Sequence, residues 1–209
     1  MSTSSVKTDN STLSRLDQVW LKLESFMNLL AGFTIFLLVG LAVVHVVSRK
    51  LLNAPVPGYV DWTQQFMAVF AFLGLSFCQR EGGHIRMDIL VGQLRRRPLW
   101  IAEWLSTLFM LLLATALIYG TYFHFERSFA WDKPLWSRDS SIDIALPLWP
   151  AKLIVTFSMA VLWVRLWLQL WGFGRAVKEN SEMPVAVPLI EDPATQAMHE
   201  AETVGNANG

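Results

Sequence analysis

Cysteine and charge are both scarce in this sequence. Cys78 is its single cysteine, so the chain contains neither a disulfide framework nor a CxxC redox pair. Charged residues make up 16% of the 209 residues, well below the roughly 25% of soluble domains. The 17 basic and 17 acidic side chains cancel, so the overall charge indicates no nucleic-acid partner. Such a low charge content is typical of a protein that contacts lipid.

The sequence contains long apolar stretches. Four of them run at about 26–47, 60–79, 99–123 and 150–173, and each has about 20 residues or slightly more, as a membrane-spanning helix requires. Within residues 31–47, only Thr34 and His45 have side chains able to form hydrogen bonds. The sequence therefore predicts an all-α integral membrane protein with four transmembrane helices.

The basic residues predict the orientation of these helices. With four spans, both termini and the connector between the second and third spans share one side of the membrane. Short segments rich in Lys and Arg resist translocation, so the more basic side should be cytoplasmic, with both termini on it. The basic residues on that side are Lys7, Arg15, Lys22, Arg80, Arg86, Arg95, Arg96, Arg97, Arg175 and Lys178, and those on the other side are Arg49, Lys50, Arg127, Lys133, Arg138 and Lys152.

Polar and amphipathic segments flank the four-span domain, which we place at residues 26–175. Residues 1–11 predict a disordered leader. Residues 12–25 predict an amphipathic helix at the membrane interface, because apolar residues recur at steps of three and four, although a simple extension of the first span fits the same period. Residues of about 84–96 predict a second interfacial helix. Residues 176–209, rich in Glu, Asp, Pro and small residues, predict a disordered acidic tail.

Arg165 is the most costly residue to place in a membrane, since a charged arginine at mid-helix costs about 2.5–3.5 kcal/mol on insertion scales. It lies about two turns before the predicted cytoplasmic end of its span, where a long side chain can extend to the headgroups. Nearby Trp163, Trp167 and Trp171 also indicate an interfacial position. We therefore expect Arg165 to reach the headgroups. The alternative is a carboxylate on another subunit, because we expect no acid within the chain's own spans to meet it.

Few residues within the predicted spans offer chemistry. His45 and His124 fall at similar depths near the outer ends of the first and third spans, as a bis-histidine haem would need, although chance placement at membrane edges gives the same pattern. Nucleophile–base constellations, metal-ligand spacings and phosphate loops are missing from the sequence. Interrupted spans and acids near the middle of a span, which are typical of transporter cores, are missing too. The sequence predicts no catalytic, cofactor-binding or metal-binding residues, and so a subunit or scaffold and not an enzyme.

Several motifs follow one another between residues 46 and 94. The first span ends at Arg49, and the second starts with the motif YVDWTQQ at residues 59–65. The second span contains Phe-Leu-Gly at residues 72–74 and is followed by REGGHIRMDIL at residues 80–90. Together they resemble the small membrane (Q) subunit of tripartite ATP-independent periplasmic (TRAP) transporters, whose signature is Gly-His-Ile-Arg-hydrophobic-Asp. Family members often carry Glu where this chain has Gln64 and Gln65, and Asp61 is only a partial substitute.

The resemblance implies a non-catalytic scaffold subunit in the bacterial inner membrane. Such a subunit forms a heterodimer with a large multi-span permease subunit, which holds the substrate and sodium sites. A periplasmic binding protein delivers the substrate, typically an organic acid, and the sodium gradient drives uptake. A haem-carrying electron carrier and a membrane interaction protein unrelated to transport remain the alternatives. The residues expected to contact the large subunit or lipid are Arg49, Asp61, Trp62, Gln65, His84, Arg86, Asp88 and Arg165.

Overall fold

The computed structural model describes residues 12–81 and 97–179, and most of these residues are helical. Within the described residues the only extended pairing consists of two isolated bridges, so the predicted all-helical fold is confirmed. In chain order the elements are α1 (Thr12–Val47), the π-helical turn η1 (Ser48–Leu52), α2 (Tyr59–Leu73), α3 (Leu75–Arg80), α5 (Arg97–Ser128), the 3-10 turn η2 (Pro134–Trp136) and α6 (Trp149–Glu179).

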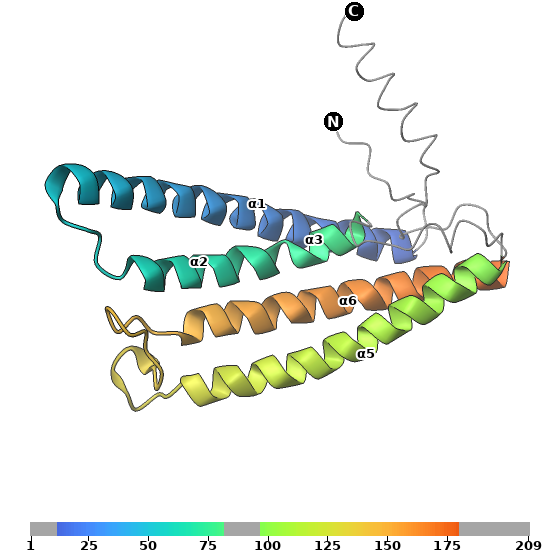
Figure 1. Cartoon of the computed structure of the whole chain (residues 1–209). Helices are drawn as coiled ribbons and strands as arrows, with labels where there is room; N and C mark the ends of the chain where they lie inside the picture. The colour runs from blue at the N-terminus through green and yellow to red at the C-terminus, as the bar shows by residue number, and fades with distance from the viewer. Residues whose placement is uncertain (1–11, 82–96, 180–209) are drawn as a thin grey trace, which may run out of the picture.

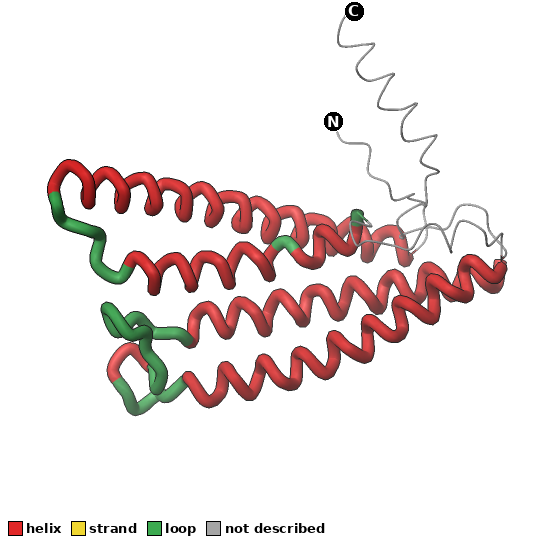
Figure 2. Tube along the Cα trace, in the orientation of Figure 1, coloured by secondary structure: helices red, strands yellow, loops and turns green. Residues whose placement is uncertain are grey.

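Three helical segments are long and apolar enough to cross a membrane, namely Thr12–Leu51, Pro98–Ser128 and Trp149–Lys178. The prediction of a continuous second span over 60–79 is wrong in one detail, because the helix is interrupted at Gly74 (Figure 2). Glycine is among the weakest helix formers. Its backbone angles there (φ −79°, ψ −11°) stay in the right-handed region, so α3 continues roughly in the direction of α2.

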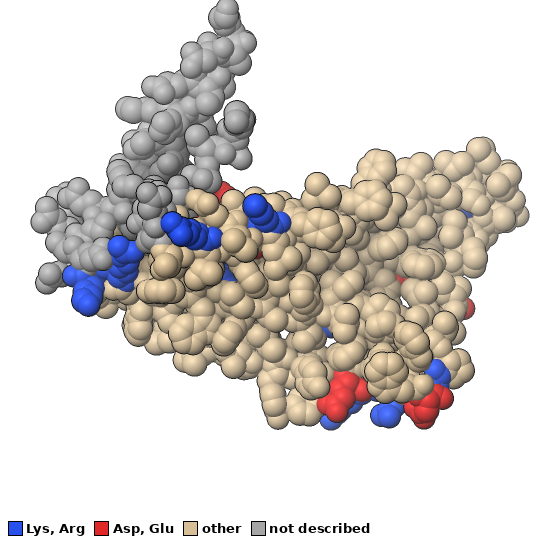
Figure 3. All heavy atoms as spheres, turned by 180° about the vertical axis from the view of Figure 1, so that it is seen from behind, with Lys and Arg blue, Asp and Glu red and all other residues tan. Residues whose placement is uncertain are grey.

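Two helical hairpins lie side by side, one made of α1 with α2 and α3, the other of α5 with α6 (Figure 1). At the terminal end of the bundle lie the start of α1, the end of α3, the start of α5 and the end of α6. At the opposite end, called the loop end below, lie residues 53–58 and 129–148. On the face shown in Figure 3, charged side chains gather toward these two ends, and most of the surface between them is uncharged.

Helix α6 is the centre of the bundle. It packs against α5 along its length and also contacts α1, α2 and α3. In its most apolar stretch 44% of the residues are buried, against 11% for α1. The core therefore follows α6, whereas much of α1 presents apolar side chains outward. The main apolar cluster between α5 and α6 contains Leu111, Ala114, Met159, Leu162, Leu166 and Leu170.

Two element boundaries extend beyond the predicted ones. Residues 12–25 and 26–47 form the single helix α1, which is the arrangement expected if the first segment simply extends the span. Helix α6 continues to Glu179, past the predicted start of the tail at residue 176, because Ala176 is buried against Trp100 and Phe173. The predicted leader, the interfacial helix at about 84–96 and residues 180–209 lie outside the described residues.

Candidate functional site

Four charged side chains meet inside the terminal end of the bundle. Asp17 and Glu24 come from α1, Arg80 is the last residue of α3, and Arg165 lies in α6. The side chain of each is at most 1% exposed. We call these four residues the ionic cluster. It joins three helices and carries two positive and two negative formal charges.

Arg165 donates to both acids of the ionic cluster. Its Nε lies 2.8 Å from Glu24 Oε1 and its Nη2 lies 2.6 Å from Glu24 Oε2, which is a bidentate pair. Its Nη1 lies 2.5 Å from Asp17 Oδ1. The expectation that Arg165 extends to the headgroups is therefore wrong. The alternative of a carboxylate on another subunit is not needed either, because Asp17 and Glu24, which precede the predicted first span, meet Arg165 from α1.

Arg80 forms the second half of the ionic cluster. Its Nη2 and Nη1 lie 2.7 Å and 3.0 Å from the two carboxylate oxygens of Asp17, and Nη1 lies 3.8 Å from Glu24 Oε2. Ser76 donates its hydroxyl to Glu24 Oε1 at 2.6 Å. Each carboxylate therefore faces both guanidinium groups. Because all four charges are withdrawn from water, removing one of them would leave a buried charge uncompensated.

A pair of buried amides continues this polar layer between α3 and α6. Gln79 Nε2 donates to Gln169 Oε1 at 2.8 Å, and Gln169 Nε2 donates to the backbone carbonyl of Gln79 at 3.2 Å. Both residues are at most 4% exposed. Hydrogen bonds of this kind fix the rotation and register of one helix on the other, since sliding would leave buried amides unpaired.

The sequence held one signal for the acids that the prediction missed. Buried positions of α1 at the terminal end include Leu13, Asp17, Glu24, Met27 and Ala31, separated by three, four or seven residues. Residues at these spacings share one face of a helix. Asp17 and Glu24 thus lie on the inward stripe together with apolar residues, not on the opposite polar face that an interfacial helix would show to water.

Asp61, one of the predicted contact residues, instead fixes a loop of the same chain. At the start of α2 its Oδ2 accepts hydrogen bonds from Ser141 Oγ at 2.5 Å and from the backbone amides of Asp143 and Ile144 at 3.2 Å and 3.0 Å. Gln65, one turn later, donates its Nε2 to the carbonyl of Pro147 at 2.9 Å. We call Asp61 and Gln65 the loop anchor, because they hold residues 141–147 on α2.

A glycine makes the loop anchor possible. Gly58 precedes α2 with a φ of +66°, in the left-handed region that side chains disfavour. A Cβ atom built at this position would lie 2.5 Å from the side chain of Ile144. The loop can therefore approach the start of α2 closely only while residue 58 has no side chain.

A second, more exposed ion pair ties the ends of the loop together. Lys152 Nζ lies 3.0 Å from Asp139 Oδ2, and the two side chains are 29% and 48% exposed. Ser128 donates its hydroxyl to the same carboxylate oxygen at 2.7 Å, and Lys152 also bonds Ser128. The Ser128 hydroxyl, followed by Lys152, holds the pKa of Asp139 below its ordinary value.

The remaining predicted contact residues occupy separate positions. Arg49 is exposed in η1. Trp62 is 37% exposed in α2, with its ring centroid 5.9 Å from that of Phe66. The structure therefore places Arg49 and Trp62 on the surface of the loop end. Three further predicted residues, His84, Arg86 and Asp88, lie outside the described residues.

The two histidines considered for haem face different neighbours. His45 stacks on Tyr59, with ring centroids 4.0 Å apart. His124 is exposed and lines a cavity with Lys152 and residues of α2, α5 and α6. Among residues 12–81 and 97–179, no group of three or more His, Cys, Asp or Glu side chains has the arrangement of a metal site. The ionic cluster and the loop anchor instead organise the protein's own helices and loops.

Comparison with known proteins finds a matching family. It matches residues 38–175, well over half of the chain, and is described as "Tripartite ATP-independent periplasmic transporters, DctQ component". This match confirms the resemblance drawn from residues 46–94. Arg80, Arg165 and the loop anchor lie within the matched residues, whereas Asp17 and Glu24 precede them. No curated protein sequence matches the chain.

Proposed function

Because the chain belongs to the DctQ component family of tripartite ATP-independent periplasmic transporters, we propose that it is a small permease subunit that acts as a fixed brace for a large transport subunit. The ionic cluster is the observation that carries this proposal. A brace must keep its helices in place while a neighbour moves, and four buried charges bonding α1, α3 and α6 resist their separation.

The proposed topology has four spans with both termini in the cytoplasm. Together α2, Gly74 and α3 cover residues 59–80, about 33 Å at 1.5 Å per residue, which is enough to cross a hydrocarbon core of about 30 Å. The terminal end would then face the cytoplasm of a bacterial cell. Arg80 is paired inside the ionic cluster, so we no longer count it among the basic residues of the loop. The remaining basic residues still favour this orientation.

The proposed partners are the large permease subunit and a periplasmic substrate-binding protein. The family description supports a three-part assembly that works without ATP. Sodium-driven uptake and an organic acid as substrate rest on the resemblance of residues 46–94 to the TRAP small subunit. Transport chemistry would then belong to the large subunit, and this chain is proposed to have no enzymatic activity. Exposed Arg49 and Trp62 remain proposed contacts with the large subunit or lipid, as do His84, Arg86 and Asp88.

Reconstitution tests the brace. Vesicles would contain the large permease subunit alone, the large subunit with this chain, or this chain alone, with the binding protein, a labelled organic acid and a sodium gradient supplied to each. We expect uptake only when both membrane subunits are present. Full uptake by the large subunit alone would contradict the brace, and uptake by this chain alone would contradict the absence of a transport site here. Failure of the two chains to co-purify would favour a membrane interaction protein unrelated to transport.

A further inference from the structure

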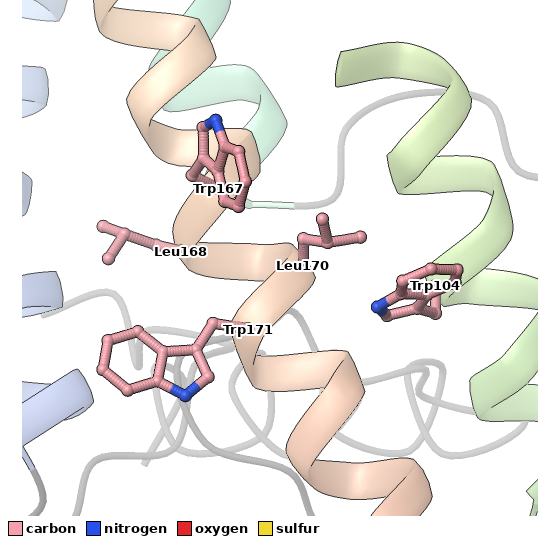
Figure 4. Close-up of a pocket in the computed structure, with 5 residues that line it drawn as sticks. All are labelled: Trp104, Trp167, Leu168, Leu170 and Trp171. Carbon is pink, nitrogen blue, oxygen red and sulfur yellow. The ribbon is translucent and has the colours of Figure 1, made fainter. Parts of the chain in front are cut away.

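An apolar groove lies over α6 at the terminal end, and neither the ionic cluster nor the loop anchor uses it. Its cavity of about 380 Å³ is lined by Trp104 of α5 and by Trp167, Leu168, Leu170 and Trp171 of α6. Figure 4 shows α5 on one side of these residues and α1 on the other. Ligand pockets in proteins occupy roughly 300–1,000 Å³, so this groove has room for a slender apolar group such as an acyl chain.

Trp104 also borders a neighbouring cavity nearer the end of α6. This second cavity of about 150 Å³ is lined by Ile101, Trp104, Gly174 and Val177. It shares Trp104 with the first cavity, and Gly174 contributes no side chain to fill it. Both cavities are apolar and border Trp104, and the second lies beside the last turns of α6.

One stripe of α6 carries aromatic rings and then a cation. Trp167, Trp171 and Lys178 are separated by four and seven residues, so they share a helical face. Trp167 and Trp171 are 49% and 53% exposed, and Lys178 is exposed about 10 Å farther along the axis. Tryptophan is enriched at the level of lipid headgroups, where its ring is apolar and its N–H can donate. This stripe thus matches an amphiphile with an apolar chain and an anionic head.

The charges around the groove favour an anionic head. Among the acids of α1 and α5 at this end, Asp17 and Glu24 are paired inside the ionic cluster and Glu103 is 8% exposed. The exposed basic residues of α1 and α6 here are Arg15, Lys22 and Lys178, with Glu81 exposed at the end of α3. Basic groups beside clefts between membrane helices are a known means of binding anionic lipid headgroups.

We propose that this groove, bordered by Trp104, Trp167 and Trp171 and followed by Lys178, binds an anionic phospholipid, with one acyl chain in the groove and the phosphate near Lys178. We choose a lipid over a helix of a partner because tryptophan rings followed by a cation, from Trp167 to Lys178, match the order of groups in an anionic lipid. This proposal requires only that the chain is embedded in a membrane and does not depend on its role in transport.

Native mass spectrometry of the full chain, delipidated and then supplied with phosphatidylglycerol or phosphatidylcholine, tests the site. We expect phosphatidylglycerol to be retained preferentially, and Lys178→Gln to lower that preference about fivefold, since one cation near anionic lipid is worth about 1 kcal/mol. Trp171→Ala should reduce retention of both lipids. Lys133→Gln, which removes an exposed lysine at the loop end, is the matched control and should change nothing.

Three results would overturn the proposal. The first is equal retention of the two lipids by the unchanged protein. The second is a preference for phosphatidylglycerol that Lys178→Gln and Trp171→Ala leave intact. The third is loss of the bound lipid whenever the large permease subunit is added, because the groove would then be a protein interface. Lys178 is exposed at the end of α6, so its replacement should leave the fold intact and keep the test decisive.

Discussion

The two ends of the bundle use similar ion pairs in very different surroundings. At the terminal end the side chains of the ionic cluster are at most 1% exposed, whereas Lys152 and Asp139 at the loop end are 29% and 48% exposed. A buried charge that loses its partner cannot be rehydrated, but an exposed one can. Similar contacts therefore have unequal consequences, and the environment decides which of them hold the fold together.

The two ends also differ in the elements that their polar contacts connect. The ionic cluster links three helices, and its members on α1 and α6 are 141–148 residues apart in the sequence. The loop anchor links one helix to one loop. Damage at the terminal end should therefore loosen the whole bundle, whereas damage at the loop end should change a local surface. In the proposed assembly, damage at the terminal end would weaken the brace. Damage at the loop end would alter only the surface of the loop, which the proposed topology places outside the cytoplasm.

The largest effect is expected from Arg165→Leu. This change leaves Glu24 with only a 3.8 Å contact to Arg80 and the Ser76 hydroxyl, and it removes one of the two guanidinium groups that face Asp17. Breaking a buried ion pair by removing one partner costs about 3–5 kcal/mol. Thermal unfolding of the full chain in lipid nanodiscs, followed by helical circular dichroism, should show a correspondingly large loss of stability.

Two companion variants separate charge compensation from packing. Glu24→Leu combined with Arg165→Leu removes a whole pair and leaves Asp17 with Arg80, so it should recover most of the lost stability. Arg165→Lys keeps the charge but loses the bidentate geometry, so it should fall between the unchanged protein and Arg165→Leu. If the double variant is less stable than Arg165→Leu, uncompensated charge is not the reason for the loss.

Gly58→Ala should have the next largest effect, confined to the loop end. Alanine at a φ of +66° costs about 1–2 kcal/mol, and its Cβ must also displace Ile144. Hydrogen exchange should become faster at the amides of Asp143 and Ile144, which Asp61 holds, and stay unchanged around the ionic cluster. Gly32→Ala is the control: it lies in α1 with open space around it, so alanine should be neutral or stabilise by up to about 1 kcal/mol. Equal effects of the two changes would show that the left-handed φ of Gly58 and its closeness to Ile144 do not matter for stability.

Length and periodicity were enough to predict the helices but not their polar contacts. The four apolar stretches became α1, α2 with α3, α5 and α6, because a long apolar run has few other ways to satisfy its backbone in lipid. Arg165 pairs with Glu24, which is 141 residues away in the sequence. The periodicity of the segment that carries Glu24 fits a helix on the membrane surface as well as a helix inside the bundle. The resemblance predicts Asp61 as a contact with the large subunit or lipid, yet its partners lie in the same chain, 80–83 residues away, and follow no pattern in the sequence. Local rules predict elements, whereas such pairings depend on how the elements pack.

Lys152→Met tests whether an exposed ion pair matters less than a buried one, on the same helix that carries Arg165. It removes a cation from α6, but the pair with Asp139 is exposed to solvent. Pairs of this kind contribute about 0–1 kcal/mol, so thermal unfolding should move little. High salt should shrink the difference further, because it screens exposed charges. A loss as large as that of Arg165→Leu would show that burial is not what separates the two ends.

The smallest effect should come from pH at the loop end. The Ser128 hydroxyl and Lys152 lower the pKa of Asp139 below its ordinary value of 3.8, so the folded loop favours the ionised carboxylate. The resulting stabilisation is complete above that ordinary pKa and is lost as the pH falls through the lowered one. Hydrogen exchange in residues 128–152 should thus be steady from pH 7 to about 5, after correction for intrinsic rates, and lose protection only in stronger acid. Asp139→Asn should remove this part of the acid response, since other carboxylates titrate in both proteins. If instead the loop opens between pH 7 and 5 in the unchanged protein and not in Asp139→Asn, the carboxylate has a raised pKa and the bonds from Ser128 and Lys152 do not hold it as described.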